Sequence, residues 1–178
     1  MKPFLAIVAV ALALAPVPSS SQTQSPYVGF EGRAIKSLSD QQIGDLRAGR
    51  GIGLALAAEL NGYPGPSHVL ELADQLELSP EQRAKVKEMF AAMKSETTPI
   101  GARLIDQESD LDRQFAGRAV SPDSLKSATA AIARTQGELR EAHLKYHLLT
   151  SAVLDKAQLA KYAELRGYAS DLPAQHHH

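Results

Sequence analysis

The chain contains 178 residues, and its 19 lysines and arginines nearly balance its 20 aspartates and glutamates, which leaves a net charge of −1 at neutral pH. This balance gives none of the basic surface that nucleic-acid-binding proteins need. The sequence has no cysteine, which excludes a disulfide framework, and its aromatic content is only 5%. Abundant Ala and Leu favour helices, and no segment alternates with period two, so we expect an all-α protein.

Residues 1–21 have the pattern of a secretory signal peptide. Lys2 supplies the positive charge, Phe4–Ala15 forms the apolar core, and Pro16–Ser21 is the region of small residues where cleavage is expected. The apolar run is shorter than the roughly 20 residues that a membrane-spanning helix needs. The sequence therefore predicts a periplasmic protein with a cleaved signal and no stable insertion in the membrane. The alternative is a retained interfacial anchor.

A polar segment, residues 22–37, follows the signal and is predicted to be flexible. Order is expected from Leu38, where one helix would run to Leu60 although three glycines, at positions 49, 51 and 53, weaken its middle. A short helix capped by Ser67 comes next. We expect one all-helical domain over residues 38–168, followed by a flexible tail, residues 169–178.

Residues 78–154 are predicted to form a long antiparallel helical hairpin. Apolar positions recur every three or four residues along both halves, which is the spacing of one helix packed along another. Both halves begin with a Ser-Pro pair, at Ser79 and Ser121, and the short turn at residues 117–121 forces an antiparallel return. The first arm would be about 55 Å long at 1.5 Å per residue. Such an arm is longer than a small core needs, so its faces are expected to serve assembly or binding.

A bend is expected in the middle of this hairpin. Pro99 lies inside the first arm, where it removes a backbone hydrogen bond. Folding about the turn brings Pro99 and Gly101 opposite Gly137, and a glycine there would let the second arm follow the bend or approach closely. The alternative is that the proline in the first arm and the glycine in the second weaken their helices independently, without a shared bend. The fold expected from the sequence is an all-α, long bent antiparallel helical hairpin with flanking shorter helices.

One helix-start signal, Leu-Ser/Thr-x-x-Gln, occurs three times. In each copy the second residue can cap the helix, and the Gln can reach back to form a capping box. The third copy carries Asp in place of the hydroxyl residue. The copies are Leu38, Ser39 and Gln42; Leu78, Ser79 and Gln82; and Leu154, Asp155 and Gln158.

With these three copies, the exported and cysteine-free helical chain resembles the Spy/CpxP group of periplasmic proteins, the LTxxQ-motif family. In that family the motif precedes the long hairpin and recurs in the last helix, which corresponds to Leu78–Gln82 and Leu154–Gln158 here. The resemblance covers about residues 38–168. It implies a cradle-shaped homodimer with ATP-independent chaperone or envelope-stress activity on unfolded protein clients. Related periplasmic hairpin proteins instead bind zinc, nickel or cobalt.

His143 and His147 stand four residues apart, the spacing of a two-ligand metal site on a helix. A helical wheel places His143 beside the apolar stripe and His147 further towards solvent. It puts Met93 within the core stripe and Met89 on the opposite edge, so a closed site inside the hairpin is not expected. The histidines are then either exposed surface or half of a site completed by a dimer partner or by His68.

The chain ends in three further histidines, His176, His177 and His178, which are either native metal ligands or part of a purification tag. The sequence contains no Cys nucleophile and none of the common hydrolase or zinc-protease motifs, so we interpret it as a binding protein and not an enzyme. No cofactor is required. The leading hypothesis is a periplasmic chaperone-like protein that holds unfolded clients. The alternative is a heavy-metal sensing or buffering protein that uses zinc or another divalent transition metal.

Overall fold

The computed structural model describes residues 25–168, which fold into one 3-10 helix and six α-helices with no β-strand among them. The signal peptide expected at residues 1–21 and the tail with His176, His177 and His178 lie outside the described residues. The elements are η1 (Phe30–Gly32), α1 (Asp40–Arg47), α2 (Leu56–Glu59), α3 (Pro66–Glu71), α4 (Pro80–Ala116), α5 (Pro122–Ser151) and α6 (Lys156–Leu165).

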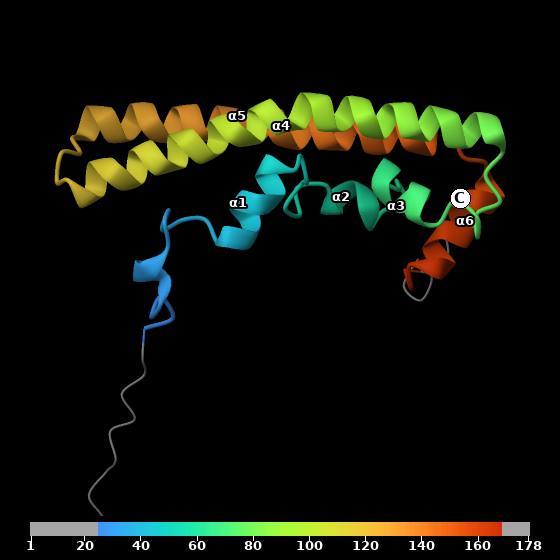
Figure 1. The fold of residues 1–178 in the computed structure, drawn as a ribbon, viewed down its shortest axis with the longest axis horizontal. Coiled ribbons are helices and arrows are strands. Elements are labelled where there is room, and N and C mark those ends of the chain that lie inside the picture. Colours follow the sequence, from blue (N-terminus) through green and yellow to red (C-terminus); the bar gives the residue numbers. More distant parts are fainter. Residues whose placement is uncertain (1–24, 169–178) are drawn as a thin grey trace, which may run out of the picture.

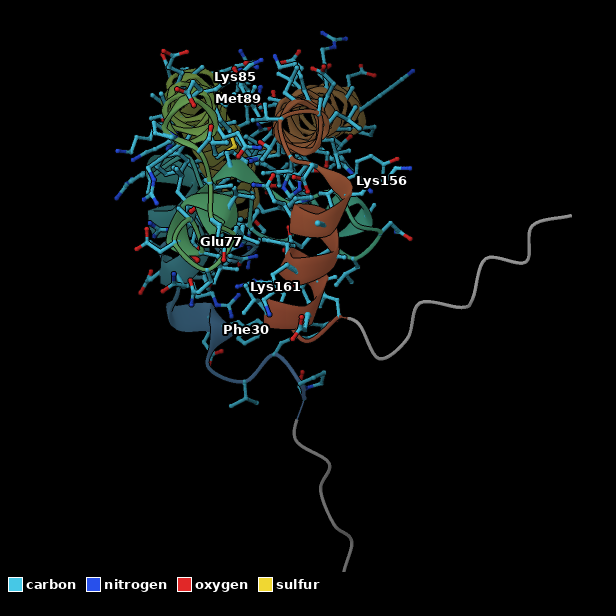
Figure 2. All side chains as sticks on the ribbon, turned by 90° about the vertical axis from the view of Figure 1, so that its right-hand side faces the viewer. Phe30, Glu77, Lys85, Met89, Lys156 and Lys161 are labelled. Carbon is cyan, nitrogen blue, oxygen red and sulfur yellow. The ribbon has the colours of Figure 1, made fainter. Side chains whose placement is uncertain are left out.

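The two long helices α4 and α5 form the predicted antiparallel hairpin and pack along each other (Figure 1). The short helices α1, α2 and α3 follow one another along one side of this hairpin, and α6 lies near its open end. An end-on view shows the two arms side by side, with the smaller helices on a common side below them (Figure 2). No helix within residues 25–168 has the length and apolar character needed to cross a membrane. The all-α prediction is confirmed.

All three copies of the start signal form capping boxes. In each box the side chain of Ser39, Ser79 or Asp155 accepts a hydrogen bond from the backbone N–H three residues on. The side-chain oxygen of the Gln at that position accepts a hydrogen bond from the backbone N–H of the capping residue. A fourth box at Ser121 opens α5. Helices α1, α4 and α6 therefore begin where the sequence indicated, because the signal is local.

The bend in the hairpin is present, but the predicted partner glycine is wrong. Helix α4 continues through Pro99 and changes direction near its middle (Figure 1). Gly101 is buried against α1 and not against the other arm, since a Cβ placed on it would lie 2.6 Å from the carbonyl oxygen of Leu46. A Cβ on Gly137 would meet nothing within 4 Å. The close approach at the bend is thus between α1 and α4.

The single helix expected from Leu38 to Leu60 is also wrong, since α1 ends at Arg47 and α2 spans only Leu56–Glu59. The glycine-rich segment between them turns repeatedly, with φ of 69° at Gly49 and 85° at Gly53. Gly49 also presses its backbone against α4, where its carbonyl accepts a hydrogen bond of 3.1 Å from the buried Thr97 hydroxyl. The glycines therefore end the first helix and let the chain lie close to the hairpin.

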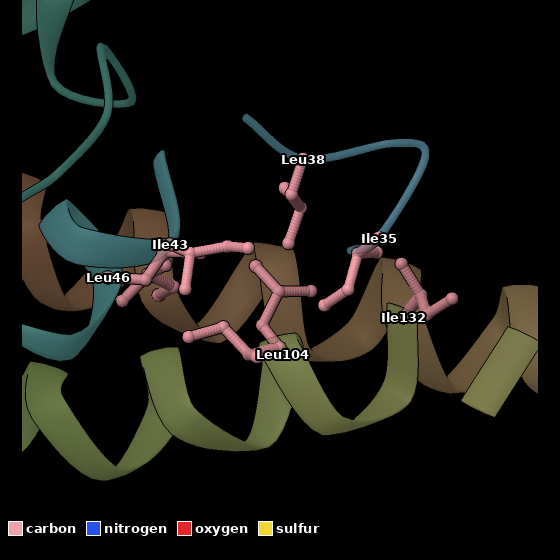
Figure 3. Packing of buried hydrophobic residues seen from close by; sticks show 8 residues of the cluster. Ile35, Leu38, Ile43, Leu46, Leu104 and Ile132 are labelled. Atoms are coloured by element: carbon pink, nitrogen blue, oxygen red, sulfur yellow. The ribbon is translucent and has the colours of Figure 1, made fainter. Parts of the chain in front are cut away.

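Two apolar clusters hold the short helices to the hairpin. The first joins α1 and the segment before it to both arms, and includes Leu46, Leu104 and Ile132 (Figure 3). Its members begin at Ile35, which is 5% exposed, so the packed part of the chain starts before the predicted boundary at Leu38. The second lies at the open end of the hairpin, where α3, α4 and α6 meet; its buried members are Val69, Ala73, Leu76, Leu78, Val86, Leu154 and Tyr162.

Candidate functional site

The second and third motif copies are bonded to each other. The amides of Gln82 and Gln158 exchange two hydrogen bonds, of 2.8 and 2.9 Å. Each amide also donates to a backbone carbonyl, Gln82 to Val153 and Gln158 to Leu76. Every polar atom of the two amides is used, so the pair fixes α6 to the start of α4. The first copy, at Gln42, forms its capping box without such a partner among the described residues.

A cavity of about 510 Å³ lies between the hairpin and the short helices. Along the arms it falls between the two apolar clusters. Its walls come from the glycine-rich segment, the first turns of α3 and facing turns of both long helices. They carry more apolar than polar surface, as small-ligand sites commonly do. Its walls include the following side chains with polar, charged or sulfur atoms: Arg50, Glu59, Ser67, His68, Met93, Lys94, His143 and His147.

Both candidate histidines of α5 are buried at this cavity. The exposed fraction is 4% for His143 and 7% for His147, so the expectation that His147 faces solvent is wrong, as is the alternative of two exposed surface histidines. The Nε2 atom of His143 is buried and has no hydrogen-bond partner among the described residues. Burial, together with the neighbouring His147, lowers the pKa of His143. The imidazole of His143 is therefore neutral at neutral pH, with an unused nitrogen.

The second histidine is held in one orientation. The Nδ1 atom of His147 lies 2.6 Å from the carbonyl oxygen of Tyr63 and 3.7 Å from a carboxylate oxygen of Glu59. Since a carbonyl oxygen can only accept, Nδ1 must carry the hydrogen. In a neutral ring this leaves the lone pair on Nε2.

Glu59 anchors α2 to the rest of the molecule and is itself only 7% exposed. It accepts hydrogen bonds from the hydroxyls of Tyr162 and Tyr168 and from the backbone N–H of Gly65. The Nε atom of Arg166 lies 3.8 Å away. Burial and the bond to Glu59 raise the pKa of Tyr162 above its usual value. These contacts give the buried carboxylate the donors that it needs, and they join α6 to the wall of the cavity.

Glycines bring the covering chain onto the two imidazoles. A Cβ on Gly51 would lie 3.2 Å from the ring of His143, and one on Gly65 would lie 2.8 Å from Nε2 of His147. A side chain at position 65 would therefore displace the ring of His147, and one at position 51 would crowd the ring of His143. The sequence marks Gly49, Gly51 and Gly53, but it does not show which residues they cover. Gly65 and Glu59 went unrecognised for the same reason.

His68 and Met93 also line this cavity, from α3 and α4 respectively. Met93 is 7% exposed and belongs to the core stripe as predicted, yet it shares the cavity with both imidazoles. Met89 is not part of the cavity wall. Nδ1 of His68 lies 3.1 Å from Glu71. Within residues 25–168 no three His, Cys, Asp or Glu side chains converge as a metal cluster.

An apolar surface lies next to the cavity. Leu56, Leu60 and Tyr63 expose 55%, 53% and 44% of their area; Leu56 opens α2, Leu60 is the residue that caps its C-terminal end, and Tyr63 follows in the next turn. Leu56 also lines the cavity, so the exposed surface and the cavity wall are continuous. We call these three residues the α2 patch. Two cationic residues, Arg50 and Lys94, also line the cavity.

The comparisons with known proteins give no relative, because no family model, no curated protein and no solved structure matches this chain.

Proposed function

We propose that this protein is a periplasmic, ATP-independent chaperone-like protein of the Spy/CpxP type, which acts by binding unfolded proteins and not by catalysis. The observation that carries the proposal is the α2 patch. Contiguous exposed apolar surface of this kind marks interaction sites in soluble proteins. The adjoining cavity offers room for an apolar side chain of the client, and Arg50 and Lys94 suit acidic residues beside it.

The test is the aggregation of chemically denatured client proteins, followed by light scattering with stoichiometric protein and no nucleotide. We expect suppressed aggregation for several unrelated clients, and weaker suppression after Leu56→Ser and Leu60→Ser are combined. Phe115→Ser is the matched control, because Phe115 is 54% exposed but lies at the far end of α4. Unchanged aggregation of all clients with the unmodified protein would exclude the chaperone function. Equal losses for both variants would exclude the α2 patch as its surface.

A homodimer is part of this proposal. The outer face of α5 carries a groove lined by Gly137, Leu144 and Leu148 together with charges of both signs, Arg140 and Glu141. Such a mixed surface is suited to pair with a copy of itself about a two-fold axis. We expect a dimer in sedimentation equilibrium and its dissociation by Leu148→Glu, since Leu148 is 58% exposed. A monomer for the unmodified chain at micromolar concentration would remove the dimer from the proposal.

The second candidate function is metal sensing or buffering. It is favoured by one observation: His143, His147 and His68 line the same cavity, and an imidazole nitrogen of His143 is unused. The test is calorimetric zinc titration of the full chain in which the three tail histidines are replaced by serine. The same chain with His143→Ala and His147→Ala is the comparison. Indistinguishable titrations would assign any binding to other residues.

A further inference from the structure

Three donor side chains meet the same cavity from both arms of the hairpin: His143 and His147 from α5 and Met93 from α4. All three are more than nine-tenths buried. Each brings an atom with an available lone pair and no formal charge, two imidazole nitrogens and one thioether sulfur. The donor set is therefore neutral and contains a soft sulfur.

Neither imidazole uses its Nε2 atom in a hydrogen bond among the described residues. In His147 the Nδ1–H is directed to the Tyr63 carbonyl, and metal-ligating histidines typically use such a backbone partner to fix the ring and its tautomer. In His143 the buried Nε2 has no partner among the described residues, although buried polar atoms normally have one. A bound cation would satisfy this atom.

We propose that the cavity binds one copper(I) ion through His143, His147 and Met93. This assignment rests on the second candidate function, metal binding, and specifies the class of metal. Thioether sulfur is a soft ligand that favours copper(I), whereas closed zinc sites are built from four ligands, chiefly Cys and His. The buried carboxylate of Glu59, 3.7 Å from the His147 ring, supplies a balancing charge.

The experiment is anaerobic titration with copper(I) against a chromophoric copper(I) chelator. It uses the full chain with His176, His177 and His178 replaced by serine. Met93→Leu removes the sulfur and nearly conserves the volume, so the fold is expected to remain. Met89→Leu is the matched control, because Met89 lies on the same helix outside the cavity wall. X-ray absorption of the copper-loaded protein provides a readout that does not depend on any variant.

We expect one copper(I) per chain, an affinity lowered at least about tenfold by Met93→Leu, no change with Met89→Leu, and nitrogen and sulfur neighbours in the absorption spectrum. Copper(I) binding without a sulfur neighbour, or with equal affinity in the Met93→Leu variant, overturns the assignment. Zinc binding that depends on His143 and His147, without copper(I) binding, overturns the copper assignment and keeps the metal candidate. Failure of both metals to bind removes the copper assignment and the metal candidate together.

Discussion

The contact between α1 and the hairpin can be tested with two identical substitutions, Gly101→Ala and Gly137→Ala. Both glycines lie inside long helices, so alanine raises the intrinsic helix stability at either position by about 1 kcal/mol. The positions differ only in what the added methyl group meets. At Gly137 it meets open space, whereas at Gly101 it would lie 2.6 Å from the carbonyl oxygen and 3.1 Å from the carbonyl carbon of Leu46.

The magnitude follows from this difference. A contact of 2.6 Å with rigid backbone cannot be relieved by rotating a side chain, so α1 must move away from α4. Overpacking of this kind costs about 1–3 kcal/mol. We expect Gly137→Ala to raise the free energy of unfolding by up to about 1 kcal/mol. Gly101→Ala should be less stable than Gly137→Ala by about 1–3 kcal/mol.

Urea denaturation followed by circular dichroism measures both values. Hydrogen exchange should show faster exchange of the α1 amides, Asp40–Arg47, in the Gly101→Ala variant alone. Equal stabilities and equal α1 exchange in the two variants would refute the packing of Leu46 on Gly101, and with it the layer of short helices that closes the cavity.

Three further outcomes are expected. Gln82→Ala and Gln158→Ala should each lower the free energy of unfolding measured by urea titration. The double variant should lose less than the sum of the two single losses, with a coupling energy on the order of 0.5–3 kcal/mol. Strictly additive losses would contradict the reciprocal amide bonds. Pro99→Ala should raise the free energy of unfolding by up to about 3 kcal/mol, because it restores a backbone bond in α4; a loss of stability would show that the bend is needed for packing. The hydrogen bond from Lys145 lowers the pKa of Glu96 below 4.5, so this pair stabilises the fold above that pH and loses its effect as the pH falls through the lowered value. Lys145→Ala should therefore lower the free energy of unfolding by under about 1 kcal/mol near neutral pH and leave it unchanged in strong acid. Thermal denaturation at the two pH values measures this difference.

The hairpin was predictable because its signals are local. Capping boxes, Ser-Pro starts and the three-four spacing act within a few residues, and Ser79 and Ser121 cap the two arms as expected. The prediction of one helix from Leu38 to Leu60 was wrong because the end of that helix is not set by local signals alone. Three glycines weakened it, but its end at Arg47 also depends on a tertiary contact, the hydrogen bond from Thr97 to the carbonyl of Gly49.

The site was predictable only in part. The spacing of His143 and His147 identified the right pair, and His68 does share their cavity. Their burial was missed, because a helical wheel describes one helix and not the chain that covers it. That cover comes from Gly51 and Gly65, far away in sequence, and no pattern of spacing relates these glycines to the imidazoles.

The two candidate functions meet at one residue, Tyr63. Its side chain belongs to the exposed α2 patch, while its carbonyl oxygen accepts the hydrogen bond of His147 at the cavity. A metal ion on Nε2 would withdraw charge from the ring and strengthen the hydrogen bond from Nδ1–H, and so would hold the Tyr63 turn more firmly. Linkage then requires that metal and client alter each other's binding by the same factor.

The aggregation assay run with and without copper(I) or zinc measures this coupling, with His147→Ala as the variant that should abolish it. A metal effect that persists in this variant would place the coupling elsewhere. A metal that binds in the cavity without any effect on clients would show that the Tyr63 turn is equally ordered in both states, and that the α2 patch works independently of His147.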